Sequence, residues 1–550
     1  MKTFRIHPVA AGVSLLLSLA SGSVLAADLQ GAKTLEAPKL DNAKLPAFQP
    51  TDLAEPPVGG PKVKLRQVQI GGNPSIGTDA LLAVLGPVAD QEYDANGLYK
   101  LARTVANHYK AQGFIFAQAY LPPQDLATGV LRIQVIEGQY GKIEAAGADD
   151  MGKNALPFVQ YVLRAGDPIV NKPLERALLI TDDLPGIKIQ PILRPGAQQG
   201  QSDLMVNVAH DEQEESGDWA FDNLGPRSTG EYRLKANFHG HSTLTFGDRA
   251  SFSGLVTDRG MWLGSLNYEL PVGYSGLRAA VGYSRSSYTL GDEFSSLGAH
   301  GLANTITAQL NHPVVRTQAS NLMLSYGWQH KSLKDYYDTV TVQTGKASNS
   351  LVLGARFDRR DQWLGGGVSY GTMTFVNGNL HLDSRLLATD AVTARTADNF
   401  SKFNLDLARI QSLSENWSLF GRVSGQWSNK NLDSSEKFNL GGFYGVRAHP
   451  LGEGTGDKGY LGQIELRYAV KPGMTPFVFY DAGRSHVNFT PWDIKSDGVR
   501  VAAGYGLGLR YIRGAWSMDM TLAQQGHGGA STSDTQNRNP RFFFLLGKRF

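Results

Sequence analysis

Alternation of apolar and polar residues runs through the last three-fifths of the chain. Between residues 417 and 427, one parity is apolar or small and the other is polar. The apolar parity consists of Trp417, Leu419, Gly421, Val423, Gly425 and Trp427, and the polar parity includes Ser418, Arg422, Ser424 and Gln426. The same period of two recurs in residues 262–270, 460–470 and 516–522. This period predicts β-strands with one apolar face.

The length of these strands indicates that the apolar face meets lipid. Strands of about 9–11 residues match the tilted span of a bilayer, and in lipid only a closed barrel satisfies the backbone groups of strands. A soluble sandwich also alternates, but its strands are usually about 5–6 residues long, and it would not keep pairs such as Trp417 and Trp427 at two interface depths. We therefore expect a membrane all-β barrel of about 16 antiparallel strands over residues 217–550.

Residues 63–210 follow mixed periods. The alternating or helically spaced segments of their first half are residues 63–70, 98–109, 114–121 and 130–135. We expect the order strand, helix, helix, strand, strand, in which residues 98–109 are one of the helices, and the same order begins again at Ile143. Repeats of about 70–80 residues are near the smallest size that folds alone. We expect two α+β domains, over residues 63–139 and 140–210, with one larger α+β domain as the alternative.

Segments of biased composition flank these domains. Residues 1–26 have a basic start, an apolar middle and a small-residue end, which predicts an export signal cleaved after Ala26. A single membrane anchor is the alternative, but the apolar run is short and is interrupted by serines. Residues 27–62 are polar and rich in proline, as is typical of an extended linker. The acidic run 211–215 predicts a solvated hinge before the barrel.

Composition narrows the function classes. The formal net charge of +3 is small and the basic residues are not clustered, so no nucleic-acid partner is expected. Cysteine is absent, which excludes disulfides and thiolate chemistry. No phosphate loop, zinc-binding helix or nucleophile elbow occurs, so we expect no catalysis, no cofactor and no metal. His239 and His241 share a strand face that fits a lumen lining better than a metal site.

Two segments near the end of the chain carry the candidate chemistry. The residues of interest are Val446, Arg447, Ala448 and His449 in a glycine-rich segment, and Phe479, Asp481 and Gly483 on one face of a strand. If that face looks inward, a loop folded into the barrel could bring Arg447 to Asp481 as a bidentate ion pair. The alternatives are a surface-loop arginine and a turn aspartate, but an intramembrane ionisable pair is costly unless it is used. Residues 452–459 are interpreted as a flexible turn rather than a calcium loop.

These motifs resemble those of the two-partner secretion transporters, the TpsB family of Gram-negative bacteria, which includes haemolysin secretion/activation proteins of the ShlB, FhaC and HecB type. The resemblance covers the signal, the linker, two polypeptide-transport-associated (POTRA) domains and a 16-stranded barrel. In the family, a loop with a Val-Arg-Gly-Tyr/Phe motif folds into the lumen and its arginine pairs with an aspartate of the wall. The matching residues here are Val446, Arg447, Phe479, Asp481 and Gly483, while Ala448 and His449 depart from the motif.

The resemblance implies a pore in the outer membrane, with its POTRA domains in the periplasm, that secretes a large exoprotein carrying an N-terminal two-partner secretion domain. We expect this exoprotein and outer-membrane lipid as the partners of a monomeric transporter. A segment at residues 32–40 resembles in position the plug helix of the family. The alternatives are a barrel insertase of the same superfamily and a passive porin or receptor. Two repeats rather than five, and the long proline-rich leader, argue against the insertase.

The resemblance also implies capture of the exoprotein by addition of its strand to an exposed sheet edge. The two candidate edges are residues 114–121 and 187–193. Their edge residues are Phe114, Phe116, Tyr120, Ile187 and Ile189.

Overall fold

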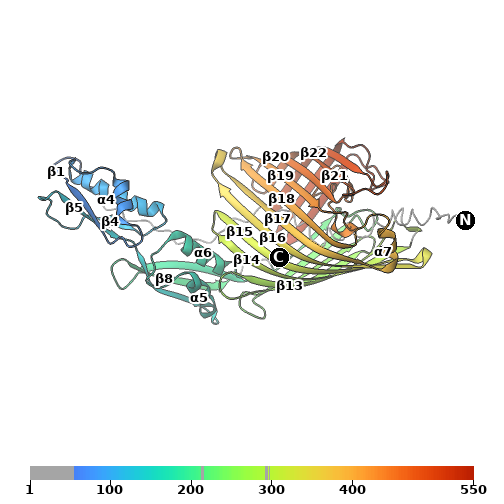
Figure 1. The fold of residues 1–550 in the computed structure, drawn as a ribbon, viewed down its shortest axis with the longest axis horizontal. Helices are drawn as coiled ribbons and strands as arrows, with labels where there is room; N and C mark the ends of the chain where they lie inside the picture. The colour runs from blue at the N-terminus through green and yellow to red at the C-terminus, as the bar shows by residue number, and fades with distance from the viewer. Residues whose placement is uncertain (1–54, 212–215, 292–294, 297) are drawn as a thin grey trace.

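The computed structural model describes residues 55–211, 216–291, 295–296 and 298–550. It shows an elongated molecule in which two small α+β units precede a large β-barrel (Figure 1). The expected signal at residues 1–26, the linker as far as residue 54 and most of the acidic run lie outside the described residues. Among the helices that the structure describes, none has the length and apolar character needed to cross a membrane.

The first unit has a three-stranded sheet, a separate two-stranded sheet and two helices. Its elements are β1 (Val63–Lys64), β2 (Gln67–Gly71), α3 (Thr78–Leu85), β3 (Glu92–Tyr93), α4 (Ala95–Ala111), β4 (Gln118–Tyr120) and β5 (Val130–Ile136). In the sheet, β5 is central, parallel to β2 and antiparallel to β4. Helix α4 begins where the Asp94 carboxylate accepts a hydrogen bond from the Gly97 amide at 2.7 Å, and its apolar stripe enters the core.

The strand expected at residues 114–121 is shorter than its alternation predicts. Only Gln118–Tyr120 form β4, while Phe114 and Phe116 precede it, next to a turn in which the Ala117 amide donates to the Phe114 carbonyl at 3.1 Å. Just before this turn, Gly113 takes a φ of 95° and the Phe114 ring packs edge-on against Tyr109 at 5.3 Å. Because the helix end draws Phe114 back onto α4, the expectation that Phe114 and Phe116 belong to an edge strand is wrong.

The second unit repeats the order of the first. Its elements are β6 (Gln139–Gly147), α5 (Met151–Val162), α6 (Asn171–Asp182), β7 (Ile187–Pro195) and β8 (Gln201–His210). Strand β8 is central, parallel to β6 and antiparallel to β7, so β7 lies at the edge of the sheet. The side chains of Ile187 and Ile189 are buried in the apolar core, so these two residues offer backbone rather than side-chain contacts at that edge.

The rest of the chain forms a closed barrel in which every neighbouring pair of strands is antiparallel. Its sixteen strands are β9 (Gly217–Asp222), β10 (Arg233–His241), β11 (Arg249–Thr257), β12 (Trp262–Pro271), β13 (Arg278–Thr289), β14 (Ala299–Arg316), β15 (Ser320–Tyr337), β16 (Val342–Asp361), β17 (Gly367–Leu382), β18 (Asp398–Ser412), β19 (Trp417–Ser428), β20 (Lys458–Tyr468), β21 (Met474–His486), β22 (Val499–Arg513), β23 (Trp516–His527) and β24 (Arg541–Arg549). A short helix, α7 (Ser384–Asp390), follows β17. The expected fold class is confirmed.

The alternation along β19 sorts side chains between the outside and the lumen. Trp417, Val423 and Trp427 expose 43%, 54% and 48% of their surface, whereas Gln426 of the other parity is buried. The apolar parity is therefore the outer face, and the polar parity lines the lumen.

The second α+β unit contacts one end of the barrel, where β14 ends. Arg176 of α6 donates to the carbonyls of Pro313 and Val314 at 2.8 and 3.1 Å, and Arg316 meets both oxygens of Asp183 at 2.6 Å. Because β14 ends at this side, the antiparallel order brings the connections after β19 and β21 to the opposite end, which we call the far mouth.

Candidate functional site: the lumen loop

Residues 429–457, which join β19 to β20 at the far mouth, form what we call the lumen loop. The loop contacts strands on separate parts of the wall: Glu436 pairs with Lys331 of β15, and Arg447 pairs with Asp481 of β21. Since both wall residues are buried inward-facing groups, the loop lies inside the barrel.

A tight backbone turn presents Arg447 to the wall. The Val446 amide donates to the Leu440 carbonyl at 2.8 Å, which closes the turn. Gly442 has a φ of 100°, and a Cβ atom on Gly445 would lie 2.3 Å from the Leu440 carbonyl oxygen. The turn thus requires glycine at both positions.

Arg447 is bonded through every nitrogen of its guanidinium group. Nε and Nη2 donate to the two carboxylate oxygens of Asp481 at 2.8 and 2.7 Å, and Nη1 donates to Glu465 at 2.6 Å. The Arg447 amide adds a fourth bond, at 3.2 Å, to Asp481. All three side chains are buried, so the two carboxylates on β20 and β21 hold the loop by a desolvated, bidentate contact.

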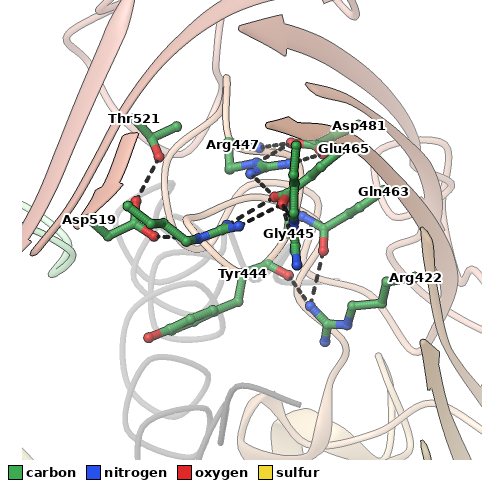
Figure 2. Close-up of polar contacts among 11 residues, drawn as sticks. Arg422, Tyr444, Gly445, Arg447, Gln463, Glu465, Asp481, Asp519 and Thr521 are labelled. Atoms are coloured by element: carbon green, nitrogen blue, oxygen red, sulfur yellow. Dashed lines mark hydrogen bonds and ion pairs between the residues drawn. The ribbon is translucent and has the colours of Figure 1, made fainter. Parts of the chain in front are cut away.

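The charge of Glu465 is shared with two further arginines of the wall. Arg467 and Arg510 approach its second oxygen at 2.7 and 2.8 Å. Arg510 also donates to Asp519 at 3.0 Å. Asp519 in turn accepts a hydrogen bond from Thr521 at 3.1 Å (Figure 2). Each carboxylate of this network faces a guanidinium group, as a buried ionic network requires.

Neutral contacts fix the loop on either side of Arg447. The Gln463 side chain donates to the Gly445 carbonyl at 2.8 Å, and Arg422 donates to the Tyr444 carbonyl at 2.9 Å (Figure 2). Arg422 is itself held by Asp406 and by the Gln463 amide oxygen, at 3.1 Å from the latter. The wall therefore binds the backbone of the loop in addition to the Arg447 side chain.

The face of β21 that carries Asp481 looks inward. Phe477, Phe479 and Asp481 are buried, while the alternate residues Val478 and Tyr480 are exposed. The Arg447 guanidinium lies 3.6 Å from the centre of the Phe479 ring, a cation–π contact.

Gly483 of the same face approaches the loop. A Cβ atom there would lie 2.6 Å from Leu440. The structure therefore brings Phe479, Asp481 and Gly483 together against the loop that carries Arg447.

The two residues that depart from the family motif are both fully buried. Ala448 packs with Phe479 and sits opposite Gly504 of β22, where a Cβ atom would come within 2.3 Å of the Ala448 methyl carbon. The His449 ring lies 3.3 Å from the Ser531 hydroxyl. Gly504 thus provides the space that Ala448 occupies.

Residues 452–459 are not the flexible turn that their glycines suggested. Glu453 is fully buried, forms an ion pair with Arg500 at 2.6 Å, and accepts hydrogen bonds from the Thr532 and Ser533 amides, both at 2.9 Å. Asp457 is also fully buried and pairs with Lys437 at 3.0 Å. Carboxylates that look solvated in a glycine-rich run are here neutralised by groups distant in sequence.

The charged residues that complete the network were not singled out from the sequence. Glu465, Arg467 and Arg422 stand on the polar parities of their strands, which is the only signal they carry. The described residues contain no group of three or more metal-ligating side chains, and the rings of His239 and His241 stack 6.4 Å apart.

Comparison with known proteins supplies the family. Residues 200–511 match the haemolysin secretion/activation proteins ShlB/FhaC/HecB, and residues 63–138 match the ShlB-type POTRA domain. The chain belongs to this family.

Relatives of known function span most of its length. The chain is 26% identical over 479 residues to the heme/hemopexin transporter protein HuxB of Haemophilus influenzae, with 84% of each chain covered. It is 24% identical over 421 residues to the outer membrane transporter CdiB of Dickeya dadantii, with 74% of this chain and 73% of the relative covered. The solved structure of CdiB from Escherichia coli shares its fold, with a TM-score of 0.71, 19% identity and full coverage of both chains.

The family match and the closed barrel together identify the chain as an outer-membrane transporter that secretes exoproteins. Its POTRA-type α+β part lies in the periplasm, so the far mouth opens to the outside of the cell. The family match supports secretion rather than barrel insertion or passive conductance.

Proposed function

We propose that the lumen loop is the gate of this transporter and that Arg447, Asp481 and Glu465 are the contact that keeps the gate in place. The observation that carries the proposal is a guanidinium group bonded on every nitrogen to two buried carboxylates of neighbouring strands. Breaking a buried pair by removing one partner typically costs about 3–5 kcal/mol, because the other charge is left without compensation. The loop therefore has one well-defined resting position, and passage of a polypeptide requires that it be displaced.

We also propose that residues 63–139 and 140–210 act as two POTRA domains, the second by its repeated element order. An exoprotein segment would add as a strand at the edge of a sheet, and β7 and β4 are the candidate edges. Tyr120, Ile187 and Ile189 belong to these strands. The transporter would act as a monomer surrounded by outer-membrane lipid. It would catalyse no reaction, because its sequence has none of the motifs of a nucleotide, zinc or nucleophile enzyme.

The gate is tested by secretion of the exoprotein from cells that carry single variants. Arg447→Ala and Asp481→Ala should each lower the exoprotein in the medium at least tenfold relative to the parent chain, because a loop that has lost its resting position opens without being coupled to the exoprotein. Arg385→Ala is the control, since Arg385 is an exposed arginine of α7 outside the barrel wall. Normal secretion by both gate variants would refute the proposal.

The partner is tested by deletion of this chain. A large exoprotein with an N-terminal secretion domain should disappear from the medium and return when the chain is supplied again. Unchanged export of every large extracellular protein would contradict the assignment of a dedicated partner.

A further inference from the structure

A second ionic contact holds the lumen loop near its beginning, far from Arg447 along the chain. Glu436 is 2% exposed and lies between two buried lysines: Lys331 of β15 at 2.6 Å and Lys402 of β18 at 2.8 Å. Lys402 also donates to the Glu436 carbonyl at 2.9 Å, and the Gln426 side chain donates to the same carbonyl at 3.0 Å. We call Glu436, Lys331 and Lys402 the base anchor.

The neighbouring residues of the loop repeat this arrangement on the next strand. Asp433 pairs with Lys346 of β16 at 2.8 Å, and Lys346 lies 3.4 Å from the Ser434 hydroxyl. The ion pairs of residues 433–436 therefore reach three strands of the wall, β15, β16 and β18, none of which contributes to the Arg447 contact.

The end of the loop is tied to its beginning. Asp457 accepts hydrogen bonds from the amides of Leu432 and Phe489 at 3.0 and 2.7 Å, and its carboxylate pairs with Lys437 at 3.0 Å. Both ends of the loop thus meet at the far mouth, while Arg447 lies between them in the sequence. Arg447 takes part in none of these contacts.

We propose that the base anchor is an independent attachment of the lumen loop. It keeps residues 433–436, the base of the loop, on the wall at the far mouth when the tip, the turn around Arg447, is released from Asp481 and Glu465. Glu436 is then a positioning residue for secretion: it sets where the loop is hinged and to where the tip returns. The inference rests on the proposed function only in that the tip is taken to move. It assigns the moving part to residues between Lys437 and Glu453, rather than to the loop as a whole.

The absence of cysteine from the chain makes a direct test possible, because each introduced cysteine is a unique target. Ser435→Cys reports on the base, since Ser435 is buried beside Glu436. Tyr444→Cys reports on the tip, close to Arg447. Each reporter is placed in the full chain, and its rate of reaction with a membrane-impermeant maleimide is measured on whole cells.

The base reporter should react at least about tenfold faster in Glu436→Gln than in the parent, because the two buried lysines lose their counter-charge. It should stay as protected as in the parent when Arg447→Ala is introduced. Glu415→Gln is the matched control, since Glu415 is exposed at the other end of β19, and it should change neither reporter. If Glu436→Gln does not reach the membrane as a heat-modifiable barrel, Lys331→Met and Lys402→Met each remove one arm of the anchor and should also speed labelling of the base.

Two results would overturn the anchor: a base reporter that labels equally fast in Arg447→Ala and Glu436→Gln, or one that stays protected in every anchor variant. The tip reporter answers a separate question. If its labelling rate in Arg447→Ala equals that in the parent while the base still responds to Glu436→Gln, the proposed gate fails and the base anchor stands.

Discussion

The geometry of the Arg447 side chain fixes the position of the lumen loop on the barrel wall. The three nitrogens of its guanidinium group donate to two carboxylates, and the group also lies over the ring of Phe479. A lysine carries the same charge but is a point donor without the planar fork. Arg447→Lys should therefore lower secretion nearly as far as Arg447→Ala, by tenfold or more. Recovery to parental secretion in Arg447→Lys would mean that charge alone, and not the forked geometry, holds the loop.

The approach of Gly504 to Ala448 gives a second prediction at the scale of residues. In Gly504→Ala the new methyl group meets the Ala448 side chain, and overpacking of this kind typically costs about 1–3 kcal/mol. We expect a lower temperature for the heat-modifiable gel shift of the barrel, together with reduced secretion. Gly421→Ala is the control, since a Cβ atom on Gly421 of β19 meets nothing within 4 Å.

A double variant separates this local clash from a general weakening of β22. Adding Ala448→Gly to Gly504→Ala removes the methyl group that the new side chain meets, so the gel-shift temperature should rise back toward that of the parent. A double variant no more stable than Gly504→Ala would assign the loss to the strand itself.

At the scale of elements, the junction between α6 and the end of β14 depends more on Arg176 than on the ion pair between Arg316 and Asp183. Arg176 satisfies the Pro313 and Val314 carbonyls, whereas Asp183, which pairs with Arg316, is nearly half exposed, and exposed pairs contribute about 0–1 kcal/mol. Arg176→Ala should speed hydrogen exchange of the turn amides, including that of Gln318, by about tenfold, and Asp183→Ala should have a smaller effect. Arg164→Ala, at an exposed site of the same unit, should have none. Equal exchange rates in Arg176→Ala and the parent would show that apolar packing alone holds the junction.

Elements were predictable from the sequence where their signal is local. The outward parity of β19 follows from a period of two, and barrel closure follows from the need to pair every strand edge in lipid. The strand at 114–121 was overestimated because contact of Phe114 with Tyr109, a tertiary effect, overrides its alternation.

The network inside the barrel was predictable only in part. The Arg447 and Asp481 positions stood out by motif, whereas Lys331, Lys402 and Glu465 look like ordinary polar residues of a wet lumen. Which lysine meets which carboxylate depends on how far the loop descends and on which strands face it. That information exists only after the barrel has closed.

At the scale of the whole molecule, the two attachments of the lumen loop predict how variants combine. Arg447 and Asp481 form one contact, so Arg447→Ala with Asp481→Ala should disturb the pore no more than Arg447→Ala alone. Arg447 and Glu436 belong to contacts on different strands, so Arg447→Ala with Glu436→Gln should add their effects on a logarithmic scale. The measurement is a single-pore current recording in planar bilayers, from which the ratio of open to closed time is taken. The open fraction should increase in each single variant, stay at the single-variant level in the first pair, and rise further in the second. Non-additivity in the second pair as strong as in the first would mean that tip and base leave the wall together, as one rigid plug, and not in the order that the separate networks require.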